Sequence, residues 1–192
     1  MNDSELVSRI IANDEQAFRL LVERYQTMVI NTCFGFIHVQ EDAQDIAQDV
    51  FIEVLHSVNK FRNEAKISTW LYRIAVNKSL NYIRSRNKFR WFRKTGEIYS
   101  NNDPVDPQIT EVTDNDTPVS IIENKERSET LHAAVNALPE NQKIAFVLNK
   151  FEELSYKEIA DVMNISLSAV ESLIFRARKS LQKKLINYYK KN

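Results

Sequence analysis

Apolar residues recur along most of the chain at steps of three and four residues, the spacing that places them on one face of an α-helix. The pattern predicts helices over 14–37, 41–58 and 67–89. Asn13 or Asp14 is the expected cap of the first helix, and Ser68 or Thr69 that of the third. The expected inward positions include Phe18, Leu21, Val50, Leu55, Trp70 and Leu71. Three helices joined by short turns predict one helical bundle with a shared core.

The helical pattern stops between about 94 and 122, a stretch that holds three of the four prolines and many Asn and Asp residues. Such a composition buries too little apolar surface to offset chain entropy, so it predicts a flexible acidic linker. Periodicity resumes near 122 and is interrupted at Pro139, where a helix must stop or restart. The sequence therefore predicts an all-α protein of two small domains, 1–93 and 123–192, joined by residues 94–122.

A helix-turn-helix is predicted within 155–184. Ser155 opens a capping box of sequence SYKE, and Asn164 stands where the turn needs a left-handed residue. Ser166 and Ser168 are both candidate caps of the next helix, and SAVE from Ser168 to Glu171 forms a second capping box. In this motif the second helix enters the DNA major groove. The alternative is a plain helical hairpin whose cations complement the helix dipole and solvent.

Charge alternates along the 192 residues although Lys+Arg and Asp+Glu are both 26. Segment 1–58 has three basic and ten acidic residues, and 59–96 has eleven and one. Segment 97–130 has two and nine, and 131–192 has ten and six. This asymmetry indicates polyanion binding by the basic segments and a basic partner for the acidic ones.

Several classes of protein are excluded by composition. One cysteine, Cys33, permits no internal disulfide framework and no zinc ribbon, and it is expected in the core. Two glycines leave no phosphate-binding loop, and no apolar run approaches the roughly 18 residues that span a bilayer. The N-terminus lacks a signal-peptide pattern, so a cytoplasmic protein is expected. His38, His56 and His132 are too scattered to predict a metal site or a catalytic pair.

Residues 59–93 combine ten cations with seven of the nineteen aromatic residues, including both tryptophans. Aromatic rings provide stacking platforms for unpaired bases, and cations follow the strand that carries them. A core role is the stronger interpretation for Trp70, Leu71 and Ile74, whereas the polar approach over 61–66 is better suited to nucleotides. One end of the protein is therefore expected to hold single-stranded nucleic acid and the other end duplex.

An acidic stripe runs along the helix predicted over 41–58. Glu41, Asp45, Asp49 and Glu53 are spaced by four residues, with Asp42 and Gln48 beside them. Three interpretations compete: a Mg²⁺ site of a nuclease, a solvated helix face, and a docking face for a basic partner. Like charges at this spacing destabilise a helix, which favours docking slightly over solvation, and metal chemistry least.

Three segments together resemble the extracytoplasmic-function (ECF) sigma factors of the sigma-70 family. EDAQDIAQDVF at 41–51 resembles the polymerase-docking helix of region 2, and FRNEAKISTWLYRIAVNKSLNYIR at 61–84 resembles its −10 element segment. LPENQKIAFVLNKFEELSYKEIADVMNISLSAVESLIFRARKSL at 138–181 resembles region 4. The resemblance covers most of the chain except the predicted linker. It implies a sigma factor that docks on core RNA polymerase, recognises −10 and −35 promoter elements, assists promoter opening and initiates transcription of a gene subset.

The resemblance also implies a role for each group of residues. Core-polymerase contacts are implied for Glu41, Asp42, Asp45, Gln48, Asp49 and Glu53. Contacts to the melted −10 element are implied for Phe61, Arg62, Asn63, Lys66, Asn77, Lys78 and Arg84. Contacts to the −35 duplex are implied for Ser168, Glu171, Ser172, Phe175, Arg176, Arg178 and Lys179. Glu171 is open to two interpretations, acceptance from a cytosine amine or capping of its helix.

No catalytic residue, metal or cofactor is expected, and the resemblance implies inhibition by an anti-sigma partner. Two other functions compete with the sigma factor. A two-domain regulator that binds operators without polymerase has no use for the aromatic and basic helix, and preference for forked DNA would separate the two. A metal-dependent nuclease would cleave DNA when Mg²⁺ is added.

Overall fold

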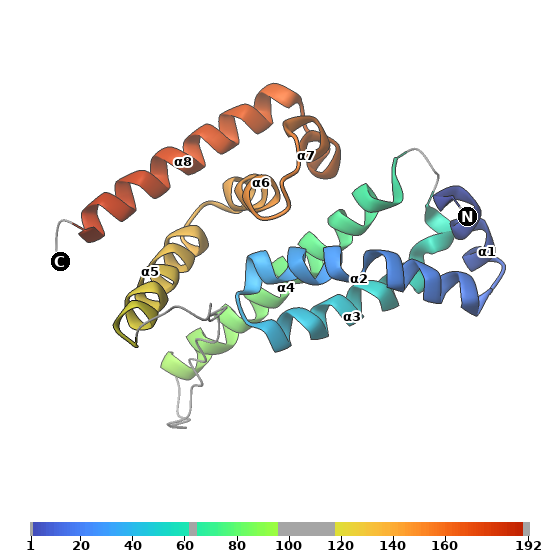
Figure 1. The fold of residues 1–192 in the computed structure, drawn as a ribbon, viewed down its shortest axis with the longest axis horizontal. Coiled ribbons are helices and arrows are strands. Elements are labelled where there is room, and N and C mark those ends of the chain that lie inside the picture. Colours follow the sequence, from blue (N-terminus) through green and yellow to red (C-terminus); the bar gives the residue numbers. More distant parts are fainter. Residues whose placement is uncertain (1, 62–64, 96–117, 190–192) are drawn as a thin grey trace.

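The computed structural model of the 192 residues describes the backbone of 2–61, 65–95 and 118–189, and the side chains of 2–61, 65–89 and 127–186. Every element in these ranges is helical, which confirms the predicted all-α class (Figure 1). The first group of helices is α1 (Asp3–Ile11), α2 (Glu15–Ile37), α3 (Gln40–Ser57), the 3-10 turn η1 (Val58–Lys60) and α4 (Ile67–Thr95). The second group is α5 (Pro118–Asn136), α6 (Glu140–Lys150), α7 (Tyr156–Met163) and α8 (Leu167–Tyr189).

The first group forms a bundle in which α2, α3 and α4 contact one another and α1 covers one end against α2 and η1. The predicted cap Asp14 is confirmed, because its side chain accepts from the amides of Gln16 and Ala17. The bundle core is apolar and fully enclosed, with Leu6, Leu21, Phe36, Val50, Val54, Ile67 and Leu71 among its members. Cys33 lies in this core, as predicted.

The sequence pattern was wrong at three places in this bundle. Helix α1 was not predicted, although Asn2 caps it by accepting from the Glu5 amide. Helix α4 begins at Ile67, so Ser68 and Thr69 lie inside its first turn and do not cap it. Leu55 is 46% exposed rather than inward, because α3 turns that position toward solvent.

The second group packs α8 along α5, α6 and α7. Pro139 precedes α6, as the sequence predicts, because proline has no N–H to donate and suits the start of a helix. Val135, Leu138, Leu148, Ile159, Val170 and Ile174 form the apolar centre of this group. None of the described helices is both long enough and apolar enough to cross a membrane.

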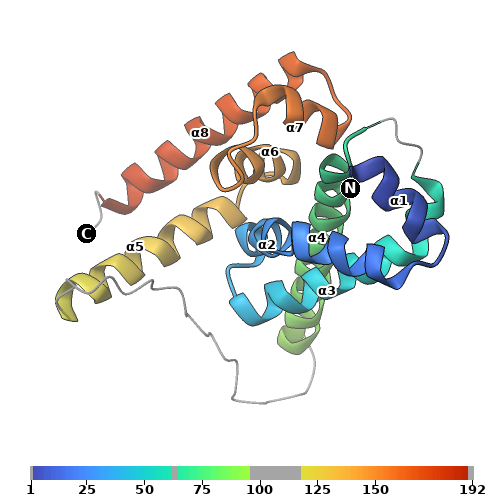
Figure 2. The ribbon, with the colours of Figure 1, turned by 45° about the vertical axis from the view of Figure 1, so that its right-hand side comes forward.

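The two groups are in contact. Helix α7 lies against α4, and α6 lies against α2, whereas α8 runs along the outer side of the second group (Figures 1 and 2). The contact is close at Gly35 of α2, where a Cβ atom would come within 2.9 Å of Val147 Cγ1. A side chain at position 35 would therefore force the two groups apart.

Candidate nucleic-acid interface

The turn between α7 and α8 has the geometry that the sequence predicts for a helix-turn-helix. Ser155 and Glu158 form the capping box, in which each side chain meets the backbone N–H of the other residue. Asn164 ends α7 in the left-handed region with φ 53°, and the Ile165 amide donates to Ala160 O at 3.1 Å. These bonds satisfy both ends of the short α7 and fix the angle at which α8 leaves it.

Ser166, rather than Ser168, caps α8. The Ser166 hydroxyl accepts from the Ala169 amide at 3.3 Å, and the helix begins at Leu167. Ser168 therefore lies in the first turn, and the second capping box predicted from Ser168 to Glu171 is wrong. Because Ser168 and Glu171 are both exposed and not used as a capping pair, their side chains are available on the outer face of the helix.

Helix α8 presents its predicted contact residues to solvent. All seven are exposed: Ser168, Glu171, Ser172, Phe175, Arg176, Arg178 and Lys179. Phe175 is 66% exposed, which is unusual for an aromatic side chain without a partner surface. Arg176 Nε donates to Ser172 O at 3.2 Å and Arg178 Nη2 to Asn149 Oδ1 at 3.4 Å, so both guanidinium groups are held near the helix. The face combines cations, hydroxyls and an aromatic ring in the arrangement that duplex readout uses.

One face of α4 carries a second basic surface. Lys66, Arg73, Asn77 and Arg84 follow one another at intervals of seven, four and seven residues and so share this face. Trp70 lies between them and packs against Phe61, with ring centroids 5.0 Å apart. Arg62 and Asn63 fall outside the described residues.

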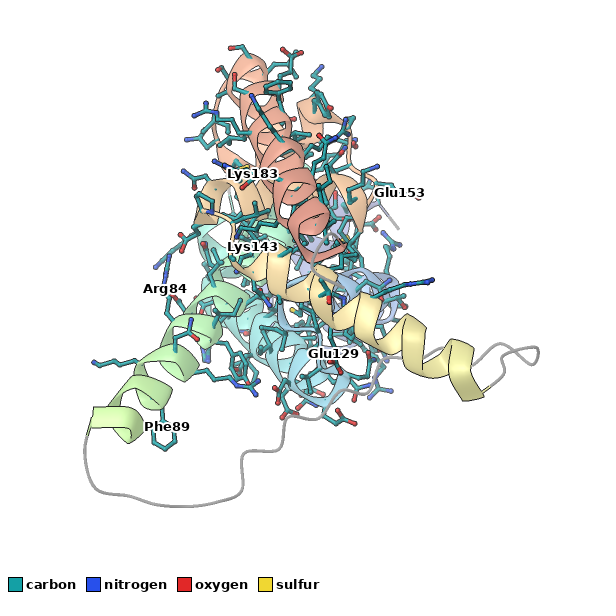
Figure 3. All side chains as sticks on the ribbon, turned by 90° about the vertical axis from the view of Figure 1, so that its left-hand side faces the viewer. Arg84, Phe89, Glu129, Lys143, Glu153 and Lys183 are labelled. Carbon is teal, nitrogen blue, oxygen red and sulfur yellow. The ribbon has the colours of Figure 1, made fainter. Side chains whose placement is uncertain are left out.

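The second helix group occupies part of this α4 face. Arg73 donates to Val162 O at 3.1 Å and to Asp161 O at 2.5 Å, both in the last turn of α7. Arg84 Nη2 donates to both carboxylate oxygens of Glu140 of α6, at 2.6 and 2.7 Å, and Figure 3 shows Arg84 on the side of α4. Asn77 lines a cleft of about 400 Å³ that α6 and α7 close from the other side. Arg73 and Arg84 of α4 thus contact the second helix group, whereas Arg176 and Lys179 of α8 lie on an exposed face.

Lys78 does not belong to this face. Its Nζ lies 3.1 Å from Glu53 Oε2, so it bridges α4 to α3. Asp42 is engaged in the same way, because it accepts from Tyr82 Oη at 2.6 Å and pairs with Arg86 at 3.4 Å. Burial and the Asp42 carboxylate raise the pKa of Tyr82, so the phenol stays protonated and donating. Three of the predicted contact residues thus connect the two helices.

The remaining acidic side chains form the exposed stripe of α3. Glu41, Asp45, Gln48 and Asp49 are all exposed. Ile52 and Leu55 continue the stripe toward η1 and are 51% and 46% exposed. Sequence reasoning missed both, because it assigned Leu55 to the core and gave Ile52 no role. The spacing from Glu41 through Asp45, Gln48 and Ile52 to Leu55, four and three residues in alternation, would have placed them on this face.

Two of the three histidines lie side by side, although they are far apart in the sequence. His38 of α2 and His132 of α5 stack face to face, with ring centroids 3.8 Å apart and planes within 1° of parallel. This pair joins the two helix groups, and residue spacing gives no sign of it. Within the described ranges, no group of three or more His, Cys, Asp or Glu side chains is arranged to hold a metal ion.

Comparison with known proteins agrees with this architecture. The model of sigma-70 region 2 matches residues 21–89, and that of sigma-70 region 4 matches residues 128–181. The RNA polymerase sigma-H factor of Pseudomonas aeruginosa is 34% identical over 95% of this chain and 93% of its own length. The ECF RNA polymerase sigma-E factor of Haemophilus influenzae is 34% identical over 96% of both chains.

Solved structures show the same fold. The chain superimposes on CnrH, solved in complex with the cytosolic domain of CnrY, with a TM-score of 0.63 and 23% identity over 96% of this chain and 97% of that one. It superimposes on the sigma factor RpoE of Bartonella quintana, solved with the anti-sigma factor NepR, with a TM-score of 0.61 and 18% identity over 88% and 96%.

An all-helical chain with an exposed recognition helix at one end and a basic, aromatic helix at the other defines a nucleic-acid-binding protein. The chain matches sigma-70 region 2 and then sigma-70 region 4, and these two matches narrow the class to one family. The chain belongs to the sigma-70 family and, within it, to the ECF sigma factors. It is a promoter-recognising sigma factor of RNA polymerase, and sigma factors are transcription initiation factors without catalysis of their own. Below, region 2 denotes α1–α4 and region 4 denotes α5–α8.

Proposed function

We propose that this sigma factor binds core polymerase through the α3 stripe, the melted −10 strand through the basic face of α4, and the −35 duplex through α8. The observation that carries the proposal is the outward face of α8, where seven predicted contact residues are exposed on a helix fixed by capped turns. The proposed surfaces on α3 and α4 add polymerase binding and −10 strand binding, which a complete initiation factor also needs. The division into 1–93, 94–122 and 123–192 is part of the proposal.

The docking surface is the part of α3 that faces solvent: Glu41, Asp45, Gln48, Asp49, Ile52 and Leu55. Its acidic half attracts a basic partner, and its apolar half supplies area that is buried on contact. Alternating steps of four and three residues suit a partner that is itself a helix, packed side by side. Asp42 and Glu53 stabilise the α3–α4 contact instead, so their substitution would affect the bundle before it affected docking.

The −10 surface combines Lys66, Asn77 and Arg84 with the Phe61–Trp70 ring pair. Lys and Arg hold backbone phosphates, and aromatic rings stack on bases that have left the duplex. Arg73 shares this face and belongs to the surface by position. Extrusion of a base from the duplex costs a few kcal/mol, and stacking at such a surface offsets that cost and keeps the promoter open.

The −35 surface lies along the first four turns of α8. Ser168, Ser172, Phe175 and Lys179 form its centre, with Arg176 and Glu171 at its margins. Arg176 can meet the O6 and N7 atoms of a guanine as a bidentate donor, and Glu171 can accept from a cytosine amine. Arg178 and Lys179 are placed to hold phosphates.

The proposed protein has no active site of its own and no cofactor, because its chemistry is recognition and charge neutralisation. It acts in the cytoplasm, where core polymerase works on promoter DNA. The solved complex of the Bartonella RpoE with NepR supports an anti-sigma factor as a further partner.

In vitro transcription on a pooled promoter library tests the proposal. Core polymerase is compared with and without the protein, and start sites are sequenced. The proposal predicts new start sites that share two upstream elements. No new start sites, with duplex binding intact in a separate shift assay, would contradict it and favour a regulator that acts without polymerase.

A further inference from the structure

The contact between regions 2 and 4 is built from specific side chains. Glu152, in the loop after α6, reaches between helices of region 2 and accepts from Tyr72 Oη at 3.3 Å. Gly35 of α2 lies directly under Val147 of α6, and Arg73 holds the end of α7. Burial raises the pKa of Glu152, whose Oε1 atom is enclosed without a hydrogen-bond partner among the described residues.

The His38–His132 stack lies in this contact. His38 is 9% exposed, and neither of its ring nitrogens has a hydrogen-bond partner in the described part of the chain. His38 follows the last residue of α2 in the left-handed region, with φ 61°, and its N–H donates to Phe34 O. Phe34 and Phe151 surround the same ring with centroids at 6.4 Å. Parallel imidazoles at 3.8 Å in such surroundings are compatible with two neutral rings and not with two charged ones.

The charged neighbours of the stack are few. Lys143 of α6 is 6% exposed, faces His38 and is bonded to Asn136, and Figure 3 shows it in the interior below α8. Glu129, on the same helix as His132, is the acidic neighbour of that ring. Burial, then His132 and Lys143, lower the pKa of His38 from 6.5 to about 3, and burial also lowers the pKa of His132.

Promoter geometry requires this contact to open. Elements centred near −10 and −35 are separated by roughly 25 base pairs, or about 85 Å of B-DNA. In the closed molecule α7 touches both α4 and α8, so the two proposed DNA surfaces lie on neighbouring helices. A polypeptide of 22 residues, the number between Thr95 and Pro118, spans at most roughly 75 Å when fully extended. One closed molecule cannot hold both elements.

We propose that the contact between regions 2 and 4 is a proton-sensitive latch, which stays closed while His38 and His132 are neutral and opens when they take up protons. Opening releases Arg84 from Glu140 and Arg73 from α7. That the released face is the −10 surface rests on the proposed function, whereas the latch itself does not.

The direction of the pH effect follows from the pKa values. Well above pH 6.5 His38 is neutral in both states and favours neither. Between pH 6.5 and about 3 only the open state binds the proton, so each unit of acidification favours opening by about tenfold. Glu152 acts in the opposite direction, because its raised pKa lets the closed state bind a proton more tightly than the open state. Glu152→Gln removes this opposing group and keeps an acceptor for Tyr72.

The latch is tested by single-molecule energy transfer in the full chain, with dyes at Lys60→Cys and Gln182→Cys. Both positions are exposed, and Cys33 is fully buried, so brief labelling modifies only the introduced cysteines. Gly35→Ala is added to raise the open population into the measurable range, since its Cβ would press on Val147 while α2 stays helical. Far-UV circular dichroism checks that the helices persist at each pH.

In the Gly35→Ala, Glu152→Gln chain, the opening equilibrium constant should rise at least about tenfold between pH 7.5 and 5.5. His38→Asn should remove most of this rise, because Asn keeps the left-handed backbone but does not titrate. The matched variant His56→Asn, at an exposed histidine of α3, should leave it unchanged.

An opening constant that is independent of pH, or an equal rise in the His38→Asn chain, would overturn the latch. So would a low-transfer signal at pH 7.5 in the chain that keeps Gly35. Because neither DNA nor polymerase is present, such a failure is distinct from a failure of the proposed function, which transcription tests.

Discussion

Helices α4 and α8 both present cations and aromatic rings, but they differ in what those side chains meet. The contact residues of α8 face solvent, and Phe175 has no covering surface. On α4, Arg73 and Arg84 meet carbonyl oxygens and a carboxylate of region 4, and only the far end, where Figure 3 shows Phe89, extends beyond it. Composition alone makes the two helices look equivalent.

The difference indicates that the two proposed DNA surfaces are covered to different degrees. A duplex can approach α8 in the closed molecule, whereas a strand bound along α4 would compete with α7 for Arg73 and with Glu140 for Arg84. Lys66 and Asn77 are exposed in the closed molecule.

Docking on polymerase should show the largest effect. Asp45→Arg with Asp49→Arg places two cations against a basic partner, and we expect a loss of affinity for core polymerase of at least about hundredfold. Glu5→Arg with Glu23→Arg makes the same charge change at exposed positions on α1 and α2 and should bind normally. Titration of labelled protein with core polymerase measures both. Normal holoenzyme formation by the α3 variant would contradict the proposal that α3 binds core polymerase.

Loss of one base contact on α8 should be smaller. Arg176→Ala is expected to weaken −35 duplex binding by about 1–3 kcal/mol if the side chain reads a guanine. Fluorescence anisotropy with the mapped −35 duplex and a scrambled duplex measures the difference, and Lys150→Ala is the control on α6. An equal loss on both duplexes would make Arg176 a phosphate contact rather than a specificity contact.

Loss of the Arg84–Glu140 ion pair should strengthen DNA binding modestly, whereas the two preceding substitutions weaken binding. Glu140→Ala frees Arg84 and is expected to strengthen binding of the mapped −10 single strand by up to about fivefold, because exposed pairs contribute at most about 1 kcal/mol. Affinity for the −35 duplex should not change. Glu153→Ala removes an exposed carboxylate elsewhere and is the control. Weaker strand binding by Glu140→Ala would show that region 4 does not compete for this face.

Substitution of a helix-capping residue in region 4 should have the smallest effect. Ser155→Ala should lower the free energy of unfolding by about 1 kcal/mol, because the Glu158 amide loses its acceptor and the Glu158 carboxylate loses the Ser155 hydroxyl. Ser168→Ala should leave stability unchanged, since Ser166 caps α8. Urea unfolding followed by circular dichroism compares the two. An equal loss of unfolding free energy in the two variants would show that Ser168 does cap α8.

Local signals predicted much of the fold. Asp14, Ser155 and Asn164 act within a few residues of their own position, and each is found in the role that its chemistry indicates. Helical periodicity located α2 and α3 nearly to the residue for the same reason. The outward face of α8 could be predicted as well, because a single helical register fixes which of its residues point away from the core.

Contacts between distant segments could not be predicted. The His38–His132 stack and the Arg84–Glu140 pair join residues far apart in sequence, and no periodicity encodes them. Leu55 was misassigned because hydrophobicity does not distinguish a core position from an interface position. Composition therefore predicted the basic surface of α4, but it did not predict that α6 and α7 contact this surface.

Site-specific crosslinking in the holoenzyme bound to promoter DNA tests the division of labour most directly. A photoreactive amino acid replaces Asn77 on α4 in one protein and Phe175 on α8 in another, and the crosslinked nucleotides are mapped. We predict that position 77 reaches the single strand near −10 and position 175 the duplex near −35. Crosslinks from both positions to duplex DNA alone, or to the same element, would contradict the account.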